Sequence, residues 1–328
     1  MNLAKIPEPA TCFDDRLITR LPPVRGRLTL NTVLGPTTWF RVGGPAQILF
    51  RPADLEDLKN FLAGCPLEIP LTVIGVASNL LIRDGGIPGV VIKLGKEFSS
   101  IETDGETVTA GAAALDITVA QTAALAGIGG LEFLSGIPGS IGGAIRMNGG
   151  AYGAEMTDVM ITADVLDRAG QMRHLSPKDM NMSYRKNEIP ENVVFTGATL
   201  KGRREDPKII QERMAEIKLK RSSTQPIREK TSGSTFANPA GDKKAWQLID
   251  EAGCRGLKLG GAQMSDMHCN FMINTGNATA ADLERLGEMV IRKVFEKSGI
   301  TLRWEIRRIG IPLEKDWDLM QTKREGHA

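Results

Sequence analysis

The first third of the chain alternates short apolar runs with polar positions, a spacing that is typical of β-strands, and one stretch follows helical spacing instead. Residues 52–62 predict a helix that Asp54 caps, because its apolar side chains recur on one face. Residues 71–82 predict a buried strand that runs into a turn, and residues 89–94 predict a second buried strand. This order of strand, helix and strand predicts a small α/β unit over residues 22–100.

The pattern changes over residues 101–205, where strand-like runs are joined by short turns. The first pair predicts a hairpin that turns at Asp104-Gly105, and a second hairpin is expected to turn near Ala169-Gly170. A short helix ended by glycine lies between the hairpins, and a further strand follows them. Because these strands are connected by hairpins, the segment predicts an antiparallel α+β subdomain.

A third module is predicted over residues 206–310, which begin with a helix that ends at Gln225-Pro226. Its clearest element is a helix that opens at Thr279. The inner face of that helix is expected to consist of Leu283, Leu286, Val290 and Val294. A strand is expected over residues 301–310. Residues 1–21 are interpreted as a lead-in, and residues 311–328 as a polar tail.

Composition narrows the possible functions. The 328 residues carry a net charge of +2 and only 5% aromatic residues, which argues against a basic surface or stacking platform for nucleic acid. No stretch approaches the roughly 20 apolar residues of a membrane span. The four cysteines are scattered without a paired motif, so neither a metal site nor a disulfide framework is expected. We therefore expect a protein with reduced thiols, located in the cytoplasm.

Two glycine-rich loops offer consecutive backbone N–H groups that no large side chain obstructs. The first consists of Ile74, Gly75, Val76, Ala77, Ser78, Asn79 and Leu80, and the second includes Gly136, Pro138, Gly139, Ser140, Ile141, Gly142 and Gly143. Such loops bind anions, above all phosphates, so both are predicted to contact the pyrophosphate of a dinucleotide. The alternative is that both are tight turns at chain crossings. Neither loop fits the Rossmann or the P-loop pattern.

Several segments together resemble one family, the UDP-N-acetylenolpyruvoylglucosamine reductases, from about residue 31 to residue 310. The resemblance is carried by NTVLGPTTWFRVGGPA, VIGVASNLLIRDGG, LEFLSGIPGSIGGAIRMNGGAYG, MSYRKNEIP, TSGSTFANP, GLKLGGAQMSDMHCNFMIN and RWEIRRIG. It implies an α+β flavoprotein fold of the vanillyl-alcohol-oxidase type. FAD would lie between two N-terminal subdomains, and a C-terminal α+β domain would complete the substrate pocket.

The resemblance also implies an activity in bacterial peptidoglycan synthesis. The family uses NADPH to reduce non-covalently bound FAD, and the flavin then reduces UDP-N-acetylglucosamine enolpyruvate to UDP-N-acetylmuramate. Three residues match the family's catalytic positions. Ser234 corresponds to the proton donor, Arg185 to the group that pairs with the substrate carboxylate, and Glu305 completes the site. From the strand pattern alone, Glu305 is expected to face solvent instead.

Four further residues are candidates for contacts with the UDP-sugar: Asn238, His268, Lys258 and Arg41. The interval from Lys186 to Gly233 contains no tyrosine, so the chain resembles the shorter branch of the family, which lacks a tyrosine-bearing segment over the substrate. Asn187 is a departure, because the family often has serine there. A small-molecule substrate, no nucleic-acid or membrane partner and a monomeric state are expected.

Two other functions stay open at the level of the sequence. One is a flavin oxidase of the same fold, although neither glycine-rich loop contains the histidine or cysteine that often tethers FAD in such enzymes. The other is a nucleotide-binding protein without catalysis. The joint presence of Arg185, Ser234 and Glu305 argues against the second alternative.

Overall fold

The first subdomain is a four-stranded sheet that carries one helix. The structure, a computed structural model, describes residues 13–313. The sheet has the order β1-β2-β5-β3, in which β1 and β2 are antiparallel and β2, β5 and β3 run parallel. Its elements are η1 (Asp15–Arg20), β1 (Arg27–Val33), η2 (Gly35–Thr37), β2 (Pro45–Arg51), α1 (Leu55–Gly64), β3 (Leu71–Val73), β4 (Leu80–Ile82) and β5 (Ile87–Ile92).

Helix α1 forms where the periodicity predicts it. The side chain of Asp54 accepts a hydrogen bond from the amide of Asp57 and so caps the first turn. Leu58 and Phe61 are fully buried and pack with Phe50 of the sheet. The prediction of one strand running through residues 71–82 is wrong in part, because β3 ends at Val73 and a separate strand, β4, begins after the loop.

The second subdomain is built on a five-stranded antiparallel sheet of the order β12-β11-β13-β7-β6. Both predicted hairpins are confirmed, since β6 pairs with β7 and β11 pairs with β12. The elements from residue 96 to residue 204 are η3 (Lys96–Phe98), β6 (Ile101–Asp104), β7 (Thr107–Gly111), α2 (Asp116–Leu125), β8 (Ile128–Gly129), η4 (Glu132–Gly136), α3 (Ile141–Arg146), β9 (Gly150–Ala151), β10 (Ala154–Glu155), α4 (Met156–Val159), β11 (Met160–Leu166), β12 (Met172–Leu175), β13 (Val194–Lys201) and β14 (Arg203–Arg204).

The C-terminal part packs around its longest helix. Thr279 forms a capping box with Asp282 at the start of this helix, and Gly299 ends it in the left-handed conformation. All of the residues predicted for its inner face are fully buried, which confirms that prediction. The elements are α5 (Pro207–Thr224), α6 (Ala245–Glu251), β15 (Lys258–Leu259), β16 (Ala262–Met264), β17 (Met272–Asn274), α7 (Ala280–Ser298) and β18 (Arg307–Ile309).

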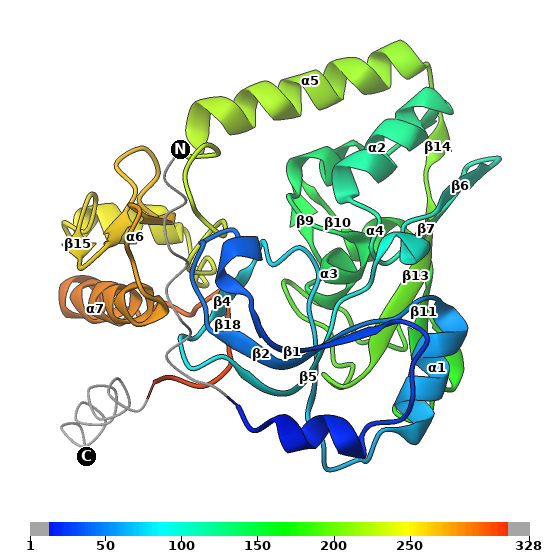
Figure 1. Cartoon of the computed structure of the whole chain (residues 1–328). Coiled ribbons are helices and arrows are strands. Elements are labelled where there is room, and N and C mark those ends of the chain that lie inside the picture. Colours follow the sequence, from blue (N-terminus) through cyan, green and yellow to red (C-terminus); the bar gives the residue numbers. More distant parts are fainter. Residues whose placement is uncertain (1–12, 314–328) are drawn as a thin grey trace, which may run out of the picture.

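The three parts are interlocked rather than strung in series. Figure 1 shows α6 and α7 on one side of the molecule, the second sheet with α2 on the other, and α5 running across the top. Arg213 of α5 pairs with Glu132 and Glu205 of the second subdomain, so this helix is attached there as well. Strand β18 pairs in parallel with β4 of the first subdomain. The boundaries predicted from the sequence stay predictions, and most of both predicted terminal segments lies outside the described residues.

The predicted strand over residues 301–310 is wrong for its first half. Only β18 is a strand, whereas Trp304 makes a single bridge to Phe236. The backbone around Glu305 is irregular because other parts of the chain take its hydrogen bonds. The amide of Glu305 donates to Thr235 O, and Asn79 Nδ2 donates to Glu305 O.

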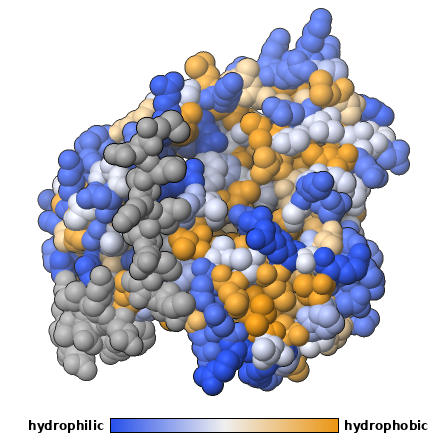
Figure 2. Space-filling model, in the orientation of Figure 1, coloured by the Kyte–Doolittle hydropathy of each residue, from blue (hydrophilic) through white to orange (hydrophobic). Residues whose placement is uncertain are grey.

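The surface mixes hydrophilic and hydrophobic residues, and in Figure 2 the apolar area is broadest in the lower half of the view, around the sheet of β1, β2 and β5. Among residues 13–313 no helix is both long and apolar enough to cross a membrane.

Candidate active site

Both glycine-rich loops line one cavity of about 370 Å³ at the junction of the three parts. Every residue of the first loop, from Ile74 to Leu80, lies on its wall. The second loop contributes all of its predicted residues except Ile141, which is fully buried in the core of the second subdomain. The two loops approach closely, because a Cβ on Gly75 would lie 2.9 Å from Ser140 Oγ. Both loops thus lie on one cavity, and their contact with a pyrophosphate stays a prediction.

The first loop has the free donors that an anion needs. The consecutive amides of residues 75–79 donate to no other group within the described part of the chain. A row of unpaired N–H groups on a cavity wall fits the diphosphate of a dinucleotide such as FAD. In the second loop some of the backbone amides already donate to other parts of the protein. The amides of Ile141 and Gly142 donate to Ala114 O and Ala112 O.

The three residues predicted to be catalytic meet on this cavity. Arg185 Nε lies 2.9 Å from Glu305 Oε1, although the N–H does not point at the oxygen well enough to count as a hydrogen bond. Arg185 Nη2 donates to Gly150 O at 2.9 Å. Ser234 follows Gly233, which has a φ of 83°, and its hydroxyl has no hydrogen-bond partner among the described residues. The free hydroxyl of Ser234 and the paired guanidinium of Arg185 line the same cavity, so both are open to a bound substrate.

Glu305 faces the cavity and not the solvent, so the expectation from the strand pattern is wrong. Its side chain is 15% exposed, because the irregular backbone turns it inward between β4 and the Ser234 loop. Burial raises the pKa of this carboxyl above its usual range, and the neighbouring Arg185 opposes that rise. In this pair the poorly solvated carboxyl of Glu305 lies against the permanently charged guanidinium of Arg185.

Further cations line the same cavity, and sequence reasoning did not single them out as site residues: Lys93, Arg146, Arg221 and Arg307. Burial lowers the pKa of Arg146 to about 10, and the nearby Arg307 lowers it as well, so Arg146 stays charged at neutral pH. Arg221 ends the basic run of residues 218–221 in α5, and its guanidinium makes a hydrogen bond only with Gln225 among residues 13–313. Together with Arg185, these side chains give the cavity a positive lining that suits a substrate with several negative charges.

Asp116 is a carboxylic acid on the wall of the same cavity. Its carboxyl is fully buried, and neither oxygen has a hydrogen-bond partner in the described residues. Burial raises the pKa of this carboxyl well above its ordinary value. Oδ2 lies where a Cβ on Gly139 would approach it to 2.6 Å, which gives that glycine a packing reason. Gly139 therefore has a packing role beside its place on the cavity wall, and both interpretations of the loop stay predictions.

The four residues predicted to contact the UDP-sugar do not line the cavity. Asn238 Oδ1 accepts a hydrogen bond from the amide of Ala245, and the ring of His268 packs edge-on against Phe271. Lys258 is exposed on β15, and the guanidinium of Arg41 donates to Pro36 O. Their predicted role stays a prediction that the geometry of the cavity does not support.

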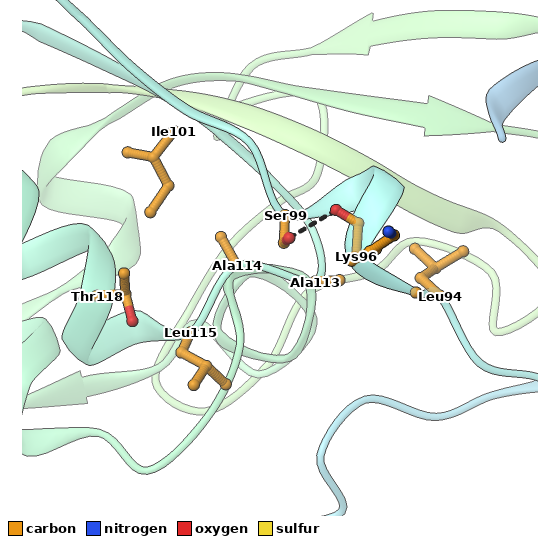
Figure 3. A pocket seen from close by; sticks show the side chains of 9 residues that line it. Leu94, Lys96, Ser99, Ile101, Ala113, Ala114, Leu115 and Thr118 are labelled. Atoms are coloured by element: carbon orange, nitrogen blue, oxygen red, sulfur yellow. Dashed lines mark hydrogen bonds between the residues drawn. The ribbon is translucent and has the colours of Figure 1, made fainter.

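A second, more open hollow of about 420 Å³ adjoins the first, because Leu94 and Ala113 lie on both walls. Figure 3 shows Lys96, Ser99 and Thr118 around it, and among the side chains drawn only the hydroxyl of Ser99 is bonded, to Lys96 O. This hollow extends the space between η3 and α2 next to the glycine-rich loops.

The loops, the cavity and the comparisons define a class of protein. Residues 46–176 match the model of an FAD binding domain. Residues 225–309 match the model described as UDP-N-acetylenolpyruvoylglucosamine reductase, C-terminal domain. These matches confirm the predicted fold class, an FAD-binding fold followed by a C-terminal α+β domain. The chain is a flavin-dependent oxidoreductase.

Relatives then fix the family. The chain is 57% identical over 302 residues to UDP-N-acetylenolpyruvoylglucosamine reductase of Rhodospirillum rubrum, which covers 91% of this chain and 95% of the relative. It is 59% identical over 291 residues to the reductase of Paramagnetospirillum magneticum, with 89% and 94% covered. The solved reductase from Thermus caldophilus is 36% identical, with a TM-score of 0.75, and the match covers 88% of this chain and 100% of that one. The chain belongs to the UDP-N-acetylenolpyruvoylglucosamine reductase family.

Proposed function

We propose that the chain reduces the enolpyruvyl ether of UDP-N-acetylglucosamine to the lactyl ether of UDP-N-acetylmuramate, with FAD as its cofactor and NADPH as the reductant. One observation carries the proposal. Arg185, Ser234 and Glu305 come from three distant segments and line the cavity that both glycine-rich loops also line. The unpaired amides of residues 75–79 support non-covalent binding of the FAD diphosphate there.

An enol ether accepts hydride poorly unless the charge that develops on its carboxylate side is stabilised. FAD supplies the hydride when it is bound and reduced. Addition at the terminal methylene carbon leaves negative charge shared between the neighbouring carbon and the carboxylate of the substrate. Arg185 is the group to receive that charge, because its guanidinium is permanently charged and offers donors for two oxygens. Preorganised donors of this kind contribute several kcal/mol, about 3 for one well-placed hydrogen bond.

The neighbouring carbon must then take up a proton, and we assign this step to Ser234. A serine hydroxyl is a weak acid, so it serves only against a strongly basic carbon that is held within hydrogen-bond reach. The position of Ser234 is fixed on both sides. It bridges Phe271 in antiparallel fashion, and the next residue, Thr235, accepts a hydrogen bond from the amide of Glu305 at 2.9 Å. The hydroxyl itself is left free to face the substrate.

Glu305 holds Arg185 in place through their ion pair. Burial raises the pKa of this carboxyl, and the charge of Arg185 opposes the rise and favours the ionised form of the pair. The remaining cations of the cavity suit the diphosphate of a UDP-sugar. Arg221 is a candidate for such an anion, since no carboxylate pairs with it among the described residues, whereas Arg307 pairs with Glu191.

The proposal is tested by separating the two half-reactions without oxygen. NADPH is expected to bleach the visible absorbance of bound FAD, and UDP-N-acetylglucosamine enolpyruvate is expected to restore it. In Ser234→Ala, bleaching should survive while restoration slows by several orders of magnitude, because the proton donor is missing. Ser223→Ala is the control, since this exposed serine on α5 donates only to Lys220 O.

Other outcomes would favour the alternatives. Rapid return of colour with oxygen but not with the enolpyruvyl substrate would point to an oxidase. Bound nucleotide without any bleaching would point to a protein that only binds. Equal loss of both half-reactions in Ser234→Ala would contradict the role of this serine. We further propose that the protein acts as a monomer in the bacterial cytoplasm, which size-exclusion chromatography with light scattering and cell fractionation would test.

A further inference from the structure

The segment that carries Arg185 has little regular structure of its own. Residues 181–193 contain no helix and no named strand. Ser183 and Lys186 exchange both backbone hydrogen bonds at 2.9 Å, which leaves Tyr184 and Arg185 at the tip of a two-residue turn. The guanidinium of Arg185 therefore points into the cavity from a small loop that cannot support itself by secondary structure.

This loop is also strained. Arg185 has a φ of 56°, in the left-handed region that glycine occupies without cost and other residues occupy at about 1–2 kcal/mol. The two hydrogen bonds of the turn offset part of that cost, but they do not attach the turn to the rest of the protein. Strain of this kind persists only where surrounding contacts determine the conformation.

Asn187 supplies such contacts immediately after the turn. Its Nδ2 donates to Ile145 O at 2.9 Å and to Arg146 O at 3.0 Å, the last carbonyls of α3. Its Oδ1 accepts from the amide of Ile189 at 3.2 Å. One side chain thus satisfies two carbonyls at the end of a helix and fixes the backbone on its own far side. A serine hydroxyl has one proton and a shorter reach, so it cannot make all three bonds.

Arg146 completes the attachment from the same helix. Its Nη1 donates to Ile189 O at 2.9 Å, its Nη2 donates to Val193 O at 3.0 Å, and its guanidinium lies over the ring of Phe195. Asn148, which is fully buried, adds a bond from Nδ2 to Ser183 O on the near side of the turn. The segment is therefore tied on both sides of Arg185 to α3 and to the residues just after it, and α3 begins within the second glycine-rich loop.

We propose that Asn187 is a positioning residue for the reaction, which holds the turn of residues 183–186 against α3 so that Arg185 stays paired with Glu305 in the cavity. The inference rests on the proposed function, since Arg185 matters only if substrate charge develops beside it. Helix α3 begins in the second glycine-rich loop, and its last carbonyls bind Asn187 beside the turn of residues 183–186. The helix therefore connects the predicted cofactor site to the turn that carries Arg185. The placement of Arg185 then depends on a side chain that touches no substrate.

The experiment compares Asn187→Ala and the milder Asn187→Ser with Asn192→Ala. Asn192 is a matched control because it lies in the same segment, is exposed and makes no hydrogen bond among the described residues. Each FAD-loaded variant is reduced with NADPH and then mixed with UDP-N-acetylglucosamine enolpyruvate in a stopped-flow instrument. Reoxidation should slow by about tenfold or more in Asn187→Ala and by less in Asn187→Ser. Reduction by NADPH should change by less than about twofold.

A second measurement does not depend on turnover. Hydrogen exchange at the amides of Ser183 and Lys186 should speed up in Asn187→Ala and stay as in the wild type in Asn192→Ala. If the wild type is reoxidised and Asn187→Ala matches it in rate and in exchange, the inference is overturned and the proposed function stands. If reduction and reoxidation fall together, Asn187 is only structural and the inference is overturned. A reduced wild type that the substrate does not reoxidise overturns both.

Discussion

Glu284 of α7 is a buried carboxylate that joins the C-terminal part to the first subdomain. Arg83 donates to it through both Nε and Nη2, at 3.0 and 2.8 Å, and Arg308 adds a third bond at 3.0 Å. The side chain of Glu284 is only 6% exposed. Arg308 lies on β18, next to the segment that carries Glu305, so this carboxylate also secures one wall of the cavity. We therefore predict a large effect from Glu284→Gln.

The magnitude follows from burial. Removing one partner of a buried ion pair costs about 3–5 kcal/mol, because the remaining charges lose their compensation. Both guanidiniums keep more than a quarter of their exposure, 28% for Arg83 and 29% for Arg308, and water screens part of that loss. We expect Glu284→Gln to lower the free energy of unfolding by about 2–4 kcal/mol. Urea titrations followed by circular dichroism measure this change.

Glu288→Gln is the control for this prediction. It is the same substitution one turn further along α7, at a side chain that is 54% exposed and that accepts from Arg308 and from Trp304 Nε1. An exposed pair contributes less than about 1 kcal/mol. If Glu284→Gln costs no more than Glu288→Gln, the reasoning that assigns the junction to a buried ionic cluster is refuted.

Two further outcomes are expected. Burial places the pKa of Asp116 above the unfolded value of about 3.9, so its contribution to stability is full below that pH and is lost as pH rises toward the folded pKa. Asparagine cannot ionise, so the melting temperature of Asp116→Asn should fall less steeply with rising pH than that of the wild type. Equal slopes for the two proteins would contradict the reasoning. Gly287→Ala should destabilise the protein even though alanine gains about 1 kcal/mol in helix propensity, because its Cβ would lie 2.1 Å from the ring of Trp304. An unchanged or higher melting temperature would show that Trp304 moves aside freely.

The local sequence was sufficient to predict a helix or hairpin wherever that element is stabilised by its own residues. Helix α7 is determined by its capping box, its buried face and its terminal glycine, all of which lie within the element. The hairpins that turn at Asp104-Gly105 and Ala169-Gly170 are likewise determined by turn residues between alternating runs. The second loop was recognisable by its glycines, which leave amides open to a ligand, whereas the first contains only Gly75 and stood out by its place directly after a buried strand.

Prediction from the local sequence failed where the backbone of an element makes its hydrogen bonds with a distant segment of the chain. Glu305 lies in a strand-like run, but Thr235 and Asn79 bind its amide and carbonyl, and the strand begins only at Arg307. Helix α5 carries Ile210, Met214 and Ile217 on one face, yet only Ile210 is fully buried. Its remaining contacts include ion pairs to the second subdomain, which periodicity does not encode.

The sequence by itself therefore determined the elements that local signals stabilise, the two loops and, through resemblance, the candidate roles of Arg185, Ser234 and Glu305. Only the tertiary structure decided that Glu305 faces Arg185, that Arg146 and Arg221 line the same cavity, and that Asn187 supports the arginine loop. The physical reason is the range of the interactions. Capping, turns and periodicity act within a few residues, whereas burial and the pairing of charges depend on segments that are far apart in the chain and meet only after folding.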